Sequence, residues 1–294
     1  MKIYLTLGMI LLQTIYGCCQ NIDLDIIVKP ASFKMLIPFE TNNRGIIIDT
    51  YWGANKIKNE LLWDNNSPTW ANEKVTIDNK SISRSKNFFY STSTADGRPI
   101  QGNIYSCDSI SLGQVTFVNV PFYKISDQMK GVFGDNLISK GVWEIDFRER
   151  KMIFASSIDS LKDLEQAELF SSNFTNDGIK ISINFRNNIR KDVELDFGFS
   201  GGILLPISDF IKINRGNNKR YKSDLQFSTP GSKHILENTQ AMDTIQIQKN
   251  MFRTIIITNK LAKEKLIGLG FFEQFEFVIF DYKNKLFYVS KKKN

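Results

Sequence analysis

Apolar residues recur at every second position in two stretches of the chain that lie far apart. Residues 33–39 place Phe, Met or Ile at alternate positions, and residues 179–185 follow the same pattern. A spacing of two is typical of strands with one buried face. Each stretch is followed by a polar turn with asparagines and then by an apolar run that ends in an aspartate, Asp49 in the first half and Asp196 in the second. Both halves therefore predict a β-hairpin that ends at an acidic residue.

The similarity continues downstream of each aspartate. An apolar segment with a glycine follows at residues 132–134 and again at residues 266–268. Each half then closes with an apolar strand, an aspartate, a basic turn and an aromatic strand, at residues 143–154 and 278–288. The hairpin aspartates are 147 positions apart (196 − 49), so the repeat has the size of a domain. We expect a mainly β protein whose two similar lobes each supply one carboxylate to a shared cleft.

The amino-terminal segment has the pattern of a signal sequence. Lys2 precedes an apolar run that is too short for a comfortable membrane span. Residues 15–18 resemble the bacterial lipobox, so Cys18 is the expected site of lipidation, with ordinary signal cleavage as the alternative. The 294 residues suffice for two domains that each have a core. The expected organisation is a signal segment with lipobox at 1–18, a first lobe at 19–155, a linker at 156–175 and a second lobe at 176–294.

Composition narrows the possible functions. The aromatic content of 12%, with 23 phenylalanines, favours sheet-rich packing over helical bundles. The net charge of +7 is spread along the chain, and its only tight basic run, at residues 291–293, is expected to be a solvated tail. His234 is the only histidine, which excludes histidine-rich metal sites, and three cysteines do not make a disulfide framework. We therefore expect no metal, no cofactor and no nucleic-acid partner.

These motifs together resemble the aspartic peptidases, in particular bacterial retropepsin-like proteins with two tandem lobes. The family signature is an apolar strand, then Asp, Thr or Ser, and Gly, with an apolar-apolar-Gly segment later in each lobe. Residues 196–206 follow this pattern except at Phe197 and Phe199, and both later glycine segments keep it. The resemblance covers nearly all of the mature chain. It implies a mainly β fold in which two retropepsin- or pepsin-like β-barrel lobes surround a central cleft.

The resemblance also implies that Asp49 and Asp196 form a catalytic pair. Two adjacent carboxyl groups cannot both ionise readily, so they share one proton. The ionised member draws a proton from a bound water, which attacks the peptide carbonyl, while the protonated member hydrogen-bonds to the carbonyl oxygen. The family therefore implies hydrolysis of peptide bonds by an aspartate-activated water between the lobes.

Each lobe departs from the family motif at a different position. In the family, the hydroxyl residue after the aspartate bonds across to the other lobe, and the next glycine leaves room at the water site. The first lobe keeps the hydroxyl as Thr50 but has Tyr51 in place of the glycine. The second lobe has Phe197 in place of the hydroxyl but keeps the glycine as Gly198. A bulky Tyr51 near the water site is expected to obstruct the cleft.

Two functions consequently stay open. The first is an aspartic endopeptidase, a hydrolase of the bacterial cell envelope that is held to the membrane by its lipid and cleaves extended peptides. The second is a non-catalytic homologue that binds peptides or envelope partners. In both cases the expected partner is a peptide or protein in extended conformation, since strand-like ligands pair with backbone edges in such a cleft.

Three other patterns have simpler explanations. Residues 196–198 spell the metal-binding triplet of protein kinases, but the rest of the kinase signature is absent. Asp146 and Asp281 recur in the two halves, but each precedes an aromatic and a basic residue at a turn and is expected to stabilise that turn. Cys107 is expected to be a small, partly buried residue rather than a nucleophile.

Overall fold

The computed structural model describes residues 25–42, 45–72, 75, 80–93, 99–125, 131–161, 163–175, 178–216, 220–229 and 232–291. The signal segment and lipobox expected at residues 1–18, and with them Cys18, lie outside the described residues. Among the described residues, none of the helices has the length and apolar character that a membrane crossing would require.

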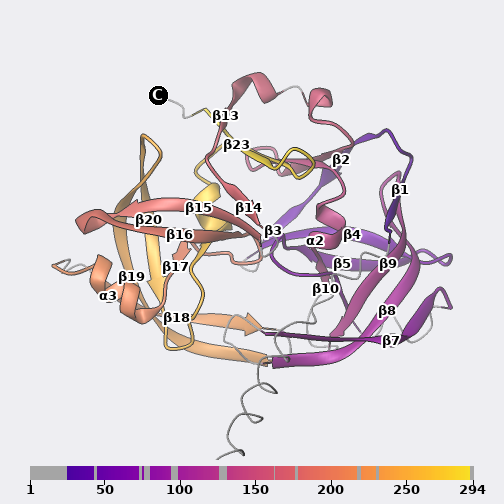
Figure 1. Cartoon of the computed structure of the whole chain (residues 1–294), viewed down its shortest axis with the longest axis horizontal. Coiled ribbons are helices and arrows are strands. Elements are labelled where there is room, and N and C mark those ends of the chain that lie inside the picture. The colour runs from indigo at the N-terminus through magenta and orange to yellow at the C-terminus, as the bar shows by residue number, and fades with distance from the viewer. Residues whose placement is uncertain are drawn as a thin grey trace, which may run out of the picture.

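The chain folds almost entirely into β-strands (Figure 1). The first half contains β1 (Ile27–Lys29), β2 (Lys34–Pro38), β3 (Glu40–Asn42), β4 (Gly45–Trp52), β5 (Ile57–Trp63), β6 (Trp70–Asn72), β7 (Ile82–Ser93), β8 (Pro99–Leu112), β9 (Val115–Ile125), β10 (Gly131–Phe133), α2 (Asp135–Ile138), β11 (Val142–Asp146) and β12 (Lys151–Ala155). The second half contains β13 (Ala167–Leu169), β14 (Asn173–Thr175), β15 (Gly178–Phe185), β16 (Ile189–Asp196), β17 (Ile203–Leu204), α3 (Ile207–Ile213), β18 (Arg220–Thr229), β19 (Ser232–Ile247), β20 (Asn250–Thr258), β21 (Leu266–Gly268), α4 (Leu269–Phe272), β22 (Phe277–Asp281) and β23 (Leu286–Ser290).

The two halves repeat strand for strand, so that β2 to β12 correspond to β13 to β23. In each half, two strands far apart in the sequence pair in parallel, β5 with β10 and β16 with β21. Similarly, β6 is parallel to β9 and β17 is parallel to β20. Each lobe has its own sheet, with nine described strands in the first and eight in the second. The mainly β, two-lobed fold predicted from the sequence is confirmed.

The hairpin prediction is correct for the second lobe and wrong for the first. The hairpin before Asp196 is confirmed, because β15 and β16 pair antiparallel and β16 ends at that residue. The prediction for the first lobe is wrong by one strand. β2 pairs with β12 rather than with β4, and the hairpin that corresponds to β15–β16 is β4–β5. That hairpin leads to Asp64, not to Asp49.

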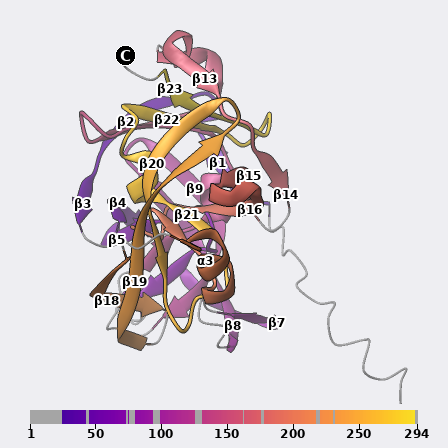
Figure 2. The ribbon, with the colours of Figure 1, turned by 90° about the vertical axis from the view of Figure 1, so that its left-hand side faces the viewer.

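A third sheet joins the lobes, with the strand order β13-β23-β22-β11-β12-β2. It lies at the top of Figures 1 and 2, and β11 pairs antiparallel with β22 at its centre. The turns after these two strands are alike. Asp146 accepts a hydrogen bond of 2.8 Å from the N–H of Glu149, and Asp281 accepts one of 3.1 Å from the N–H of Asn284. The prediction that these two aspartates stabilise turns is confirmed.

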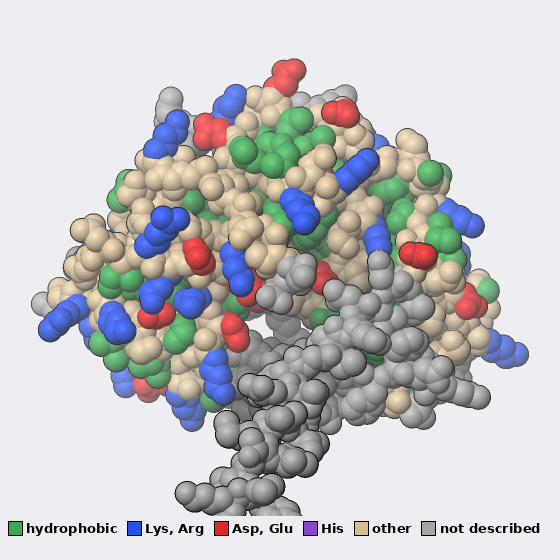
Figure 3. All heavy atoms as spheres, viewed as in Figure 1, with side chains coloured by type: hydrophobic (Ala, Val, Ile, Leu, Met, Phe, Trp, Pro, Cys, Tyr) green, Lys and Arg blue, Asp and Glu red, His purple; other side chains and the backbone are tan. Residues whose placement is uncertain are grey.

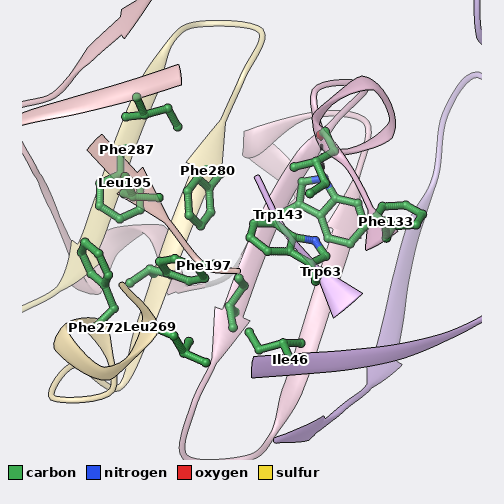
Figure 4. Close-up of a cluster of buried hydrophobic side chains, with 14 of the residues drawn as sticks. Ile46, Trp63, Phe133, Trp143, Leu195, Phe197, Leu269, Phe272, Phe280 and Phe287 are labelled. Atoms are coloured by element: carbon green, nitrogen blue, oxygen red, sulfur yellow. Dashed lines mark hydrogen bonds between the residues drawn. The ribbon is translucent and has the colours of Figure 1, made fainter. Parts of the chain in front are cut away.

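An aromatic core runs from one lobe into the other (Figure 4). The ring of Trp63 lies 5.6 Å from Phe197 and 5.4 Å from Phe280, both in the second lobe, and 5.9 Å from Trp143 in the first. Phe197 also lies 5.2 Å from Phe272. Aromatic side chains bury large areas and pack in tilted or edge-to-face pairs. The lobes are therefore joined by a continuous apolar core as well as by the shared sheet.

Residues 156–175, expected to be a linker, have two kinds of structure. Two short 3₁₀ turns, η1 (Ile158–Ser160) and η2 (Asp163–Gln166), cover the outer face of the shared sheet, where Leu161 is buried among apolar residues. The strands β13 and β14 follow, and they are the first two strands of the second repeat. The second repeat therefore begins within the segment expected to be a linker.

Charged side chains on the face shown in Figure 3 are mixed, with Lys and Arg interspersed among Asp and Glu. On this face the positive charge of the chain is not gathered into a single stripe.

Candidate active site

Two aspartates, one from each lobe, meet where β5 and β16 end. Asp64 directly follows β5, and Asp196 is the last residue of β16. A Cβ atom added at Gly198 would lie 2.3 Å from Oδ2 of Asp64, so this carboxyl group packs directly on the backbone of the second lobe. The negative charge of Asp196 is close enough to raise the pKa of Asp64. The structure therefore pairs Asp64 with Asp196.

The surroundings of the pair disfavour a double negative charge. The protein encloses most of both side chains, while part of their surface still reaches solvent. Burial raises the pKa of Asp64 well above its ordinary value, and the charge of Asp196 raises it further. Burial also raises the pKa of Asp196, against the opposing effect of backbone N–H groups at Phe199 and Gly198. Because such carboxyls titrate as a unit, one of the two retains a proton over a pH range in which the other is ionised.

Each carboxyl group is held by its own loop. Oδ1 of Asp64 accepts a hydrogen bond of 2.9 Å from the N–H of Asn66, and Oδ1 of Asp196 accepts one of 3.0 Å from the N–H of Phe199. The donor is the second residue after Asp64 in the first lobe and the third residue after Asp196 in the second. Each loop thus fixes one oxygen of its own carboxyl through a backbone N–H.

The later glycines support the two loops from behind. A Cβ at Gly134 would lie 2.3 Å from the carbonyl oxygen of Ser67, and a Cβ at Gly268 would lie 2.3 Å from that of Phe199. Contact this close is possible only for glycine. The next residue in each lobe, Asp135 or Leu269, donates its N–H to the same carbonyl oxygen. Both apolar-apolar-Gly segments thus lie against the loops that carry Asp64 and Asp196.

The side chain of Asn65 connects the two loops across the lobes. Nδ2 of Asn65 donates a hydrogen bond of 2.9 Å to the carbonyl oxygen of Leu195, and its Oδ1 accepts one of 2.9 Å from the N–H of Phe197. Both bonds are buried. Asn65 occupies the place where the family motif has a hydroxyl residue, and it bonds to the backbone on each side of Asp196.

Asp49, the residue predicted to pair with Asp196, lies elsewhere. It pairs with Glu60 across the β4–β5 hairpin. Glu60 lies four positions before Asp64 on β5, so Asp49 is displaced from Asp64 by roughly 13 Å along the strand direction. Its side chain is 48% exposed, and its Oδ2 lies 2.8 Å from Nζ of Lys58. The prediction is corrected: the outward face of β4 carries Asp49, because the neighbouring Ile48 faces the core.

The residues that follow Asp49 are likewise outside the site. Thr50 is buried on the inward face of β4 and donates to the carbonyl oxygen of Asn59. Tyr51 faces outward and is 38% exposed. The expected obstruction of the cleft by Tyr51 therefore does not occur.

The sequence contained a signal for Asp64 that spacing could have revealed. The interval from Asp64 to Gly134 is 70 positions (134 − 64), close to the 72 positions from Asp196 to Gly268 (268 − 196). The interval from Asp49 to Gly134 is 85 (134 − 49). What concealed Asp64 is that asparagines replace both the hydroxyl residue and the glycine of the family motif.

Two of the residues that depart from the family motif have side chains that are engaged away from the two carboxyls. The side chain of Asn66 hydrogen-bonds to Glu194, and its Oδ1 lies 3.2 Å from the place of a Cβ at Gly178, which is away from the pair. The ring of Phe197 is fully buried in the aromatic core. No group of three or more metal-ligating side chains occurs among the described residues. The arrangement is therefore that of two largely enclosed carboxyls whose pKa values are both raised, as in a pair that shares one proton.

Comparison with known proteins supports the fold. No family model and no curated protein sequence matches the chain. Among solved structures, the aspartic proteinase from Irpex lacteus is similar with a TM-score of 0.61 and 13% identity, covering 89% of this chain and 98% of that one. Conglutin gamma, a basic 7S globulin from lupine seeds, has a TM-score of 0.59 and 10% identity, covering 89% and 96%. The basic 7S globulin from soybean has a TM-score of 0.58 and 10% identity, covering 88% and 95%. The pepsin-like, two-lobed fold is confirmed.

Proposed function

We propose that this protein is an aspartic endopeptidase that hydrolyses peptide bonds with a water activated between Asp64 and Asp196. The observation that carries the proposal is the meeting of these two carboxyls at matching positions of the repeat. The pepsin-like fold supports it, because the same fold is found in an aspartic proteinase.

The chemistry follows from the raised pKa values of the pair. Burial raises the pKa of both carboxyls, so one member holds the shared proton while the other is ionised. The ionised carboxylate takes a proton from the water as it attacks the peptide carbonyl, and the protonated member hydrogen-bonds to the developing oxyanion. The proton taken from the water then goes to the leaving amine, which restores the pair.

The direct test is an assay of the purified protein against a library of extended peptides from about pH 3 to about pH 8, with products identified by mass spectrometry. Cleavage should be strongest at mildly acidic pH, where one carboxyl is protonated and the other is ionised. A peptide with a tetrahedral hydroxyl group in place of the scissile bond should inhibit it, since it mimics the transition state. Intact peptides at every pH, with no binding of the mimic, would refute the proposal.

The alternative is a non-catalytic homologue that binds extended peptides. The observation that favours it is the replacement of both residues after Asp64, by Asn65 and Asn66. Under this alternative, peptides bind in the assay without being cleaved. Replacing Asp64 with asparagine then leaves the binding affinity unchanged or increases it, because no chemistry depends on the carboxyl.

The contact between Asp64 and Gly198 yields a sharp prediction. The change Gly198→Ala should lower kcat by about a hundredfold, because the new Cβ pushes the carboxyl group of Asp64 out of its reactive position. The added atom would otherwise lie 2.3 Å from Oδ2 of Asp64. The control is Ser208→Ala on the exposed surface of α3, which should leave kcat unchanged. An unaltered kcat in Gly198→Ala would contradict the assigned position of the Asp64 carboxyl.

We further propose that the protein is anchored in the bacterial cell envelope by lipid on Cys18. The support is the lipobox-like sequence at residues 15–18. The change Cys18→Ala should move the protein from the membrane fraction to the soluble fraction, whereas Cys19→Ala should not, as measured by cell fractionation. A stable anchor needs more than one acyl chain, so a fully lipidated protein should resist washing with salt. Equal membrane association of Cys18→Ala and wild type would exclude the lipid anchor.

A further inference from the structure

A row of side chains crosses the sheet of each lobe on the face that carries the site aspartate. Residues two apart on a strand share a face, so Leu62 lies on the face of Asp64, and Glu194 lies on the face of Asp196. The residue between the two members of each pair is fully buried in the core. Each row therefore lies one step along the strand, roughly 7 Å, from its aspartate.

The two rows match position by position, because the same strands pair in the same register in both lobes. The row of the first lobe consists of Ile47, Leu62, Val132, Trp70, Tyr123 and Ile104. The row of the second lobe consists of Lys180, Glu194, Leu266, Leu204, Ile257 and Gln240. The first row is apolar or aromatic throughout, whereas the second has charged residues at its first two positions.

The strand positions next to the pair therefore differ between the lobes. Leu62 and Glu194 each keep part of their surface exposed. Leu62 stands between Ile47 and Val132, which are both buried. Glu194 is bonded by the side chain of Asn66. The fold does not require a carboxyl group at this position, since a leucine occupies the matching position of the first lobe.

The charges around Glu194 leave an excess of negative charge on the second-lobe side. Burial raises the pKa of Glu194, whereas the charge of Lys180 and the bond from Asn66 lower it, so these two neighbours favour the ionised form. The exposed Glu264 places a second negative charge nearby. Lys180 offsets only one of these two charges, and a positively charged ligand group would be complementary to the remainder.

We propose that Glu194 is a specificity-determining residue, which selects peptides with a basic residue on one side of the scissile bond and a large apolar residue on the other. The inference rests on the proposed function, because that function places the scissile bond between Asp64 and Asp196. Successive side chains of an extended peptide point in opposite directions, so the two residues that flank the scissile bond reach different lobes. One packs beside Leu62, and the other pairs with the carboxylate of Glu194.

The test measures the binding of peptide mimics in which a tetrahedral hydroxyl group replaces the scissile bond. Four mimics carry lysine or glutamate on either side of this group with leucine on the opposite side, and a fifth carries leucine on both sides. In one of the two orders, the wild type should bind the lysine mimic at least about tenfold more tightly than the glutamate mimic at neutral pH, as measured by calorimetry. Glu194→Gln, which keeps the size of the side chain, should reduce this ratio to less than about threefold. Glu194→Leu, which copies Leu62, should bind the mimic with two leucines best.

Asp192→Asn is the matched control. Asp192 is exposed on the same face of β16, two positions farther from Asp196, and it accepts a hydrogen bond from Ser182. Because solvent screens exposed charges, this change should leave the ratio unchanged within about twofold. A lysine preference lost equally in Asp192→Asn and Glu194→Gln would show that overall charge selects the peptide, and the inference would fall.

Binding and cleavage together separate this inference from the proposed function. If the wild type prefers the lysine mimic through Glu194 but cleaves no peptide, the specificity stands and the peptidase proposal falls. If it cleaves peptides without this preference, the peptidase proposal stands and the inference falls. Equal binding of lysine and glutamate mimics in both orders, a ratio that Glu194→Gln leaves unchanged, or no binding of any mimic would each overturn the inference.

Discussion

Replacing Asp64 with asparagine is expected to abolish peptide cleavage, and replacing Asp196 should do the same. Each change removes one half of a pair that shares a proton, so the site can no longer supply both an acid and a base. We expect kcat to fall by at least about a thousandfold in either variant, and the double variant should be no worse, because residues that act as a unit lose their function together. The measurement is the initial rate of cleavage of the best library peptide at the optimal pH.

Asp49→Asn is the matched control for this experiment. Asp49 is half-exposed and forms an ion pair with Lys58 on the outer face of β4. Exposed ion pairs contribute little, so the free energy of unfolding should change by less than about 1 kcal/mol and kcat by less than about twofold. Loss of cleavage in Asp49→Asn together with normal cleavage in Asp64→Asn would overturn the assignment of the pair.

The sequence predicted the fold well because the fold depends on features that repeat within short windows. Alternating apolar positions predict strands, and the second occurrence of the pattern predicts the second lobe. Asp196 was correctly placed at the end of its hairpin, since Gly198 and the residues after it keep the family pattern. In the first lobe two apolar runs, one ending at Asp49 and one ending at Trp63, lie on neighbouring strands, and periodicity alone cannot tell which of them leads to the site.

The sequence could not predict contacts that depend on the meeting of the lobes. Asn65 bonds to residues that are 130 and 132 positions away, and nothing in its local sequence indicates these partners. The burial of Phe197 in the shared aromatic core likewise depends on residues of both lobes, so its local sequence does not indicate it. A replacement that looks like a defect in the motif is, in the folded protein, a core residue that holds the second loop.

A second consequence of the meeting of the lobes is a buried carboxyl group outside the site. Glu144 lies at the centre of the shared sheet, opposite Ile279 of the second lobe, and its side chain is almost fully buried. Its carboxyl oxygens form no hydrogen bond of good geometry among the described residues, although the side chain of Asp163 lies within reach of them. The turns η1 and η2 cover this face, and η2 brings the acidic Asp163 close to it.

Burial, together with the nearby charge of Asp163, raises the pKa of Glu144 to about 7. The folded protein therefore binds this proton more tightly than the unfolded chain, in which a glutamate titrates near pH 4.3. The stability that goes with the bound proton is present at acidic pH and is lost as the pH rises from the unfolded value through about 7. A rise of this size corresponds to about 3 kcal/mol in the free energy of unfolding.

Glu144→Gln should therefore stabilise the protein at pH values above about 7, by about 2–3 kcal/mol relative to wild type, because the amide never becomes charged. Below about pH 4 the two proteins should have equal stability, since the wild-type carboxyl is then neutral as well. Urea unfolding at acidic, intermediate and alkaline pH measures the difference, with Glu149→Gln at an exposed turn as the control. If the difference in the free energy of unfolding between Glu144→Gln and wild type stays constant with pH, Glu144 keeps its charge in the folded protein. That result would also show that the cover formed by η1 and η2 admits water to the shared sheet.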